Sequence, residues 1–123
     1  MPIRYRIDSQ QRVIHLDLYG KLTADEIRDF RTSLEQELGG GPIFDRLIDA
    51  RGLSGEYTHA EIRRLADVVR SSDRGDEQSR RAVVMEDAPL TAKMEVFQAY
   101  TRGDPAQYRI FRRMEDAERW LAS

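Results

Sequence analysis

Cysteine is absent from the sequence, which excludes disulfide bonds, a thiol nucleophile and thiolate metal ligands. Histidine is scarce as well. His15 and His59 are the only two, and their surroundings predict a strand for the first and the first turn of a helix for the second. A metal site needs such residues to converge with carboxylates, whereas these two histidines belong to different elements. We therefore expect no metal site.

Long apolar runs are missing too. No segment approaches the roughly 20 apolar residues that a membrane-spanning helix needs, and residues 1–6 lack the apolar centre of a signal peptide. These absences predict a cytoplasmic protein without a membrane span.

Neither sign of charge dominates. The formal net charge is −2, charged residues make up 34% of the chain, and the two signs are interspersed. A nucleic-acid-binding domain would show a basic face or stripe, so we expect no nucleic-acid partner. Lys21 and Lys93 are the only lysines among 20 basic residues, and we interpret the arginine excess as composition bias.

What is present fits one compact unit. The 123 residues, 40% of them hydrophobic, are enough for one hydrophobic core, and no repeat, linker or low-complexity tail interrupts them. The sequence predicts a single domain over residues 1–123.

Alternating and continuous apolar patterns predict five strands. Residues 3–7 and 12–19 alternate between apolar and polar side chains and predict an antiparallel hairpin. Residues 44–49 and 108–111 predict two further strands. The continuous apolar run at 82–85 is typical of a central strand that is covered on both faces.

Four helices fall between and after these strands. Thr23 with Glu26 and Thr58 with Glu61 are capping boxes, which predict the starts of two helices. Pro89 suits the first turn of a third helix. A closing helix would turn one apolar face inward, made of Met114, Ala117, Trp120 and Leu121.

This order of elements predicts an α/β fold. Strands that alternate with helices form right-handed crossovers and hence a mostly parallel sheet. We expect about five strands and about four helices, with the N-terminal strand antiparallel at one edge.

Four short segments in this order resemble the SpoIIAA-like branch of the STAS family, the fold of bacterial anti-sigma factor antagonists. They are residues 18–23, 47–51 and 81–84, and the C-terminal positions Phe111, Arg112, Ala117, Trp120 and Leu121. The chain is more closely similar to uncharacterised bacterial STAS/SEC14-type domains of this length. The resemblance implies a STAS fold and a regulatory protein-interaction module without catalytic activity.

Antagonists with a phosphoswitch carry an Asp-Ser-Ser/Thr-Gly-like motif between the third strand and the next helix. Here Ser54 precedes a glycine but follows no aspartate, and Thr58 follows Tyr57. The motif is therefore not intact. Thr58 has two interpretations: a phosphate acceptor at the positive end of a helix dipole, or an N-cap that contributes about 1 kcal/mol.

Polar residues follow two neighbouring predicted strands. Asp49 and Arg51 come at the end of the third strand, and Glu86 and Asp87 follow the fourth. Ligands of open α/β sheets gather at this carboxyl edge. The alternative is that Asp49 binds loop N–H groups while Arg51 is a solvated ion-pair partner. The predicted binding site comprises Asp49, Arg51, Ser54, Thr58, Glu86 and Asp87.

The third helix carries a second candidate site. Methionine and aromatic side chains adapt to irregular apolar ligands, although ordinary core packing explains the same stripe. The predicted apolar pocket is formed by Leu90, Met94, Phe97 and Tyr100. By analogy, the relation to lipid-binding SEC14-type domains favours a pocket.

No nucleophile stands beside an oriented base, so the sequence predicts neither an enzyme nor a bound cofactor. The leading hypothesis is a module that binds a protein partner, or itself, through the loop after the third strand. The exposed strand at residues 3–7 would permit a dimer. The alternative hypothesis is a carrier or sensor of a small apolar or lipid-like ligand.

Overall fold

The computed structural model shows a five-stranded sheet with helices on both faces. It describes residues 2–39, 44–72, 78–103 and 106–123. The elements follow in the order β1 (Ile3–Asp8), β2 (Val13–Gly20), α1 (Ala24–Leu38), β3 (Asp45–Leu53), α2 (His59–Ser72), β4 (Arg80–Val84), α3 (Ala88–Thr101), β5 (Gln107–Phe111) and α4 (Met114–Ala122). The predicted order of strands and helices is confirmed.

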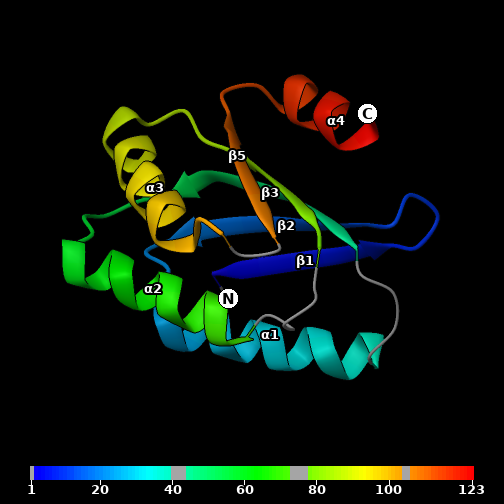
Figure 1. Cartoon of the computed structure of the whole chain (residues 1–123), viewed down its shortest axis with the longest axis horizontal. Helices are drawn as coiled ribbons and strands as arrows, with labels where there is room; N and C mark the ends of the chain where they lie inside the picture. Colours follow the sequence, from blue (N-terminus) through cyan, green and yellow to red (C-terminus); the bar gives the residue numbers. More distant parts are fainter. Residues whose placement is uncertain (1, 40–43, 73–77, 104–105) are drawn as a thin grey trace.

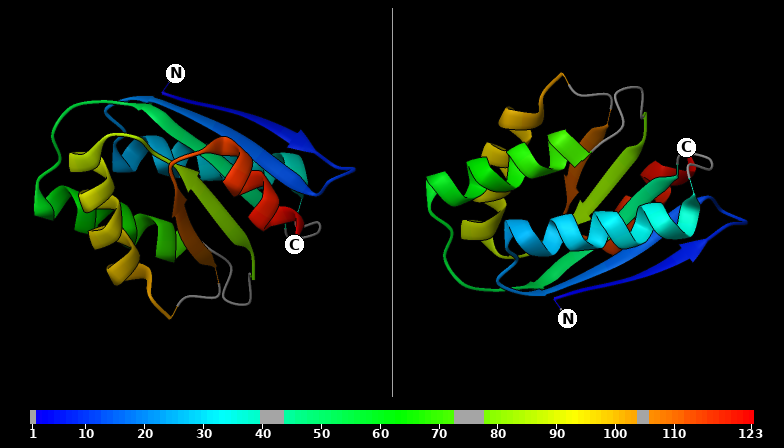
Figure 2. Two further views of the ribbon diagram at one scale, coloured as in Figure 1. Left: turned by 90° about the horizontal axis from the view of Figure 1, so that it is seen from above. Right: turned by 90° about the horizontal axis from the view of Figure 1, so that it is seen from below.

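The strands lie in the sheet in the same order as in the sequence. β1 pairs antiparallel with β2 at one edge, and all other pairs are parallel. Right-handed crossovers that always step in the same direction place their helices on one face. Accordingly, α1, α2 and α3 cover one face of the sheet and α4 covers the other (Figures 1 and 2).

The larger core lies between the sheet and α1–α3. Alternation along β2 turns Ile14, Leu16 and Leu18 toward these helices, whose apolar stripes meet them. On α1 the stripe includes Ile27 and Phe30. Burial of these faces, rather than helix propensity, holds the helices on the sheet.

A smaller core lies between the sheet and α4. Leu47, Ala82 and Val84 point to this side, and Ala117 of α4 packs on them with no exposed surface. The neighbouring side chain of Val83 points to the opposite face. β4 is therefore covered on both faces, as its continuous apolar run predicts.

The third strand is longer than the sequence analysis predicted. We ended it at residue 49, which was wrong: β3 continues to Leu53 because β2 extends to Gly20 and offers it a pairing partner. Between the pairs Asp17–Asp49 and Tyr19–Gly52, two residues of β3 face one of β2, which is a β-bulge. A polar residue and a glycine inside this stretch had suggested a loop, so the loop proper begins only at residue 54.

Candidate functional site

An apolar cavity of about 140 Å³ lies between the sheet and helices α1–α3. Its floor includes Leu16, Ile48, Ala50 and Val83 of the sheet, and its walls include Phe30, Leu65, Val69 and Phe97 of the helices. Protein interiors contain few voids larger than a water molecule. An apolar cavity of roughly 150 Å³ lined by Leu, Ile and Phe is known to bind benzene or xenon, so this one has the volume for a small apolar group.

The predicted pocket residues of α3 lie largely in this cavity. Leu90, Met94 and Phe97 line it, whereas Tyr100 does not. The Tyr100 ring instead packs edge-on against His59 at the start of α2, with 6.1 Å between ring centroids. From the sequence we placed the ligand between the sheet and the third helix and named residues of that helix only, so the walls that α1 and α2 contribute were missed. Their apolar stripes were visible, but a stripe does not show how much space its partners leave.

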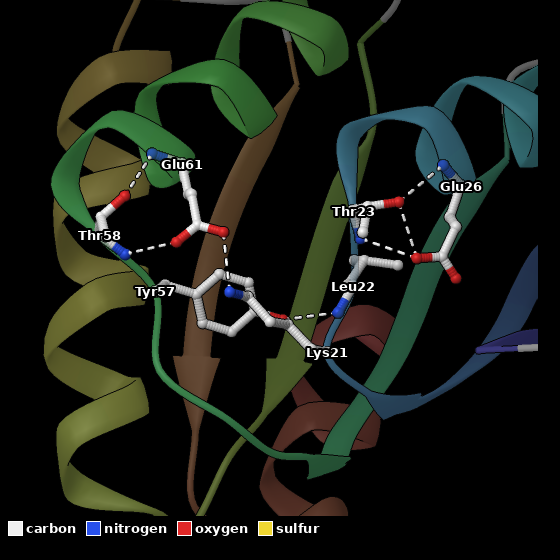
Figure 3. Close-up of polar contacts among 7 residues, drawn as sticks. All are labelled: Lys21, Leu22, Thr23, Glu26, Tyr57, Thr58 and Glu61. Atoms are coloured by element: carbon white, nitrogen blue, oxygen red, sulfur yellow. Dashed lines mark hydrogen bonds and ion pairs between the residues drawn. The ribbon is translucent and has the colours of Figure 1, made fainter.

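One end of the cavity is bounded by the segments that precede α1 and α2. Tyr57, before α2, and Leu22, before α1, both line the cavity. The Tyr57 hydroxyl accepts a hydrogen bond of 2.7 Å from the backbone N–H of Leu22 (Figure 3). Tyr57 is only 6% exposed, and its burial raises the pKa of the phenol. The Tyr57–Leu22 hydrogen bond therefore ties the starts of the two helices together.

Lys21 reinforces the same junction. Its Nζ lies 2.8 Å from Oε2 of Glu61 and 5.5 Å from the centroid of the Tyr57 ring (Figure 3). Glu61 also completes the predicted capping box of α2: its Oε1 accepts from the Thr58 N–H at 2.9 Å, and Thr58 Oγ1 accepts from the Glu61 N–H at 3.1 Å. We call Lys21, Tyr57, Thr58 and Glu61 the junction cluster.

One carboxyl group of the junction cluster, that of Glu61, has a strongly lowered pKa. The ion pair with Lys21 and the hydrogen bond from the Thr58 N–H lower the pKa of Glu61 to about 2. Because the folded-state pKa lies below the ordinary value of 4.5, this contribution to stability is complete above about pH 4.5. It is lost as the pH falls toward 2. Both groups are substantially exposed, so the contribution is small and weakens with salt.

We expect an NMR titration to place the Glu61 carboxyl midpoint near 2, and Lys21→Met to move it back toward its ordinary value. An unchanged Glu61 midpoint in Lys21→Met would contradict the assigned cause.

Three of the predicted polar residues form a separate cluster at the carboxyl edge. The Arg51 guanidinium donates two hydrogen bonds of 2.9 Å to the carboxylate of Asp49, and its Nη1 lies 3.7 Å from Oε1 of Glu86. These bonds lower the pKa of Asp49 and raise that of Arg51. Asp49 alternates with Ile48 and Ala50, which face the cavity. The Asp49–Arg51–Glu86 cluster therefore lies on the α4 side of the sheet, and the cavity on the other.

The remaining predicted polar residues lie apart from that cluster. Asp87 is the N-cap of α3, where its Oδ1 accepts from the Leu90 N–H at 2.9 Å. Thr58 is the N-cap of α2, and Ser54 is exposed in the loop after β3. Within the described ranges, no hydrogen bond or ion pair joins these three residues to Asp49, Arg51 or Glu86. The structure thus divides the predicted polar site among four places.

An exposed aromatic residue near the same edge was missed. Tyr19 is 43% exposed, and the centroid of its ring lies 5.3 Å from the guanidinium carbon of Arg4. The ring also lies close to the backbone of Gly52. A Cβ at Gly52 would lie 2.9 Å from the Tyr19 ring and 2.6 Å from the Leu18 carbonyl oxygen, so only glycine admits this packing. The alternation of β2 had placed Tyr19 on the outer face, but it gave no sign that the ring stays uncovered.

Metal-ligand groups and membrane-spanning helices are both absent from the described part of the chain. Among those residues, no group of three His, Asp or Glu side chains is arranged to hold a metal ion. None of the helices described is both long enough and apolar enough to cross a bilayer.

Comparison with known proteins agrees with this architecture. A family model described as SpoIIAA-like matches residues 13–122. The chain is also similar to an uncharacterised protein of the DUF3478 family from Shewanella loihica PV-4, whose crystal structure has a SpoIIAA-like fold. The TM-score is 0.65 at 22% sequence identity, and the match covers 97% of this chain and 91% of the other. Curated proteins give no match. The fold that the resemblance implied is confirmed.

Proposed function

The chain belongs to the SpoIIAA-like family, and from this premise we propose that it is a non-enzymatic domain that binds a small apolar ligand. The observation that carries the proposal is the cavity of about 140 Å³ between the sheet and α1–α3. The sequence favoured a protein-interaction role, with ligand binding as the alternative. The geometry favours the alternative.

Two features support ligand binding over ordinary core packing. Side chains that line an empty cavity lack dispersion contacts on that side, which lowers the stability of the fold. A bound ligand would restore these contacts. In addition, the wall on α3 includes Met94, a flexible side chain that adapts to the shape of a ligand. The predicted polar residues supply no comparable argument, because Asp49 and Arg51 satisfy each other and Thr58 and Asp87 cap helices.

Native mass spectrometry of the protein isolated from its own cells tests this function. We expect a non-covalent adduct that disappears on denaturation and can be identified in an organic extract. A mass equal to that of the bare chain, at each stage of a mild purification, would count against a retained ligand.

A second candidate function is the binding of a protein partner beside β2. One observation favours it: Tyr19 is exposed, lies near Arg4 and pairs in the sheet with Gly52, the residue after Arg51. Tyrosine and arginine are enriched in the energetic centres of interfaces. A regulatory interaction role is also typical of the family.

A photo-crosslinking amino acid at position 19, compared with one at exposed Asp29 on α1, tests this candidate in living cells. We expect one defined adduct from position 19 alone. Equal crosslinking from both positions would argue against a site at Tyr19.

A further inference from the structure

The charged residues that line the cavity indicate the charge of the ligand. We propose that the ligand is a small amphipathic anion: an apolar body about the size of a benzene ring or a short alkyl chain, with one carboxylate. This inference rests on the proposed function, since it concerns the occupant of the same cavity.

The charged residues that line the cavity all have the same sign. Arg31 of α1, Arg46 of β3 and Lys93 of α3 line it, and none of its described lining residues is acidic. The chain as a whole has a net charge of −2, so its composition does not favour a basic lining. A cavity with apolar walls, whose charged lining residues are all basic, is complementary to an apolar molecule that carries a negative charge at its end.

Each of these three residues takes a position where its element otherwise turns apolar side chains inward. Arg31 follows Phe30 on the stripe of α1, and Arg46 alternates with Ile48 and Ala50 on β3. Arg46 is only 5% exposed. Arg31 and Arg46 each make an interaction within the protein, so we assign them a contribution to the positive charge of the wall and not direct contact with the ligand.

Lys93 provides the strongest argument for an anionic ligand. It lies three residues after Leu90 and four before Phe97, so all three share the face of α3 that lines the cavity. Lys93 is partly buried, and no described carboxylate lies within ion-pair distance of it. An anionic group at the cavity wall would give this ammonium a charge-assisted partner.

Isothermal titration of the intact protein with phenylacetate and with 2-phenylethanol tests the inference, because the two probes share the ring and differ in charge. We expect phenylacetate to bind about tenfold more tightly, since a hydrogen bond to a charged group contributes about 1.5 kcal/mol or more. Lys93→Met should remove this preference, so that the two probes bind with similar affinities. Lys93→Gln serves if the methionine variant does not fold.

Arg102→Met is the matched control. Arg102 is exposed at the C-terminal end of the same helix and does not line the cavity, so its loss should leave the preference for phenylacetate intact. If 2-phenylethanol binds and phenylacetate binds no more tightly, the anionic ligand is refuted while the apolar site stands. If Lys93→Met keeps the preference, the role of Lys93 is refuted. If neither probe binds, both the proposed function and this inference fail.

Discussion

Replacing Ala50 by leucine is expected to abolish the binding of 2-phenylethanol and to make the protein more stable. Ala50 lies on the cavity floor and is 3% exposed, so the larger side chain would extend into the cavity. Burial of the added carbons contributes up to about 2 kcal/mol, and we expect a net gain of about 1 kcal/mol after the lost side-chain entropy. Binding should weaken more than fiftyfold, because the leucine occupies the volume that the ring needs.

Ala82→Leu provides the matched control for this variant. Ala82 lies on the neighbouring strand β4 but faces α4, where the described residues leave it no exposed surface. The same substitution should therefore overpack this core and cost about 1–3 kcal/mol while 2-phenylethanol still binds. Urea unfolding and calorimetric titration of both variants give the comparison. A destabilised Ala50→Leu would mean that the floor has no room for a larger side chain.

Replacing Phe97 by alanine is expected to lower the free energy of unfolding by about 3–5 kcal/mol. Phe97 is buried between α3 and the sheet, and its ring packs edge-on against Tyr108 with 5.3 Å between centroids. The Tyr108 hydroxyl in turn accepts a 2.7 Å hydrogen bond from Arg81, which is fully buried. Losing the Phe97 ring thus removes dispersion contacts and loosens the packing around a buried cation.

The same change should enlarge the cavity and shift its preference toward larger ligands. We expect 2-(2-naphthyl)ethanol to bind Phe97→Ala more tightly than it binds the wild type. The control is Tyr100→Ala, three residues along α3 and outside the cavity lining, which should cost less and leave the preference unchanged. A loss of stability in Phe97→Ala as small as that in Tyr100→Ala would contradict the assigned packing.

The sequence predicted the framework of the fold because its signals are local. The capping boxes at Thr23 and Thr58 and the proline in the first turn of α3 act within a few residues, and the structure confirms all three helix starts. The antiparallel position of β1 followed from the short turn that joins it to β2. β3 was cut short because its last residues depend on a partner strand and a bulge, neither of which is encoded nearby.

The candidate sites were harder to predict because they depend on which face a side chain takes. Asp49 and Ala50 are adjacent in sequence, yet the first belongs to an ion-pair cluster on the α4 side and the second to the cavity floor. Lys93 stood in the apolar stripe of the third helix, and its spacing from Leu90 and Phe97 was the signal that would have placed it at the cavity. A cavity volume depends on three helices and a sheet at once, so no sequence pattern reports it.

A methyl NMR titration with 2-phenylethanol tests the central claim most directly, because methyl groups on both faces of the sheet report separately. We predict saturable shift changes at Leu16, Leu65 and Val83, which line the cavity. The methyl groups of Leu47 and Leu121, in the core against α4, should not shift and serve as the internal reference. Shifts of equal size on both faces, or no saturable shift at the cavity methyls, would contradict the claim that this cavity is a ligand-binding site.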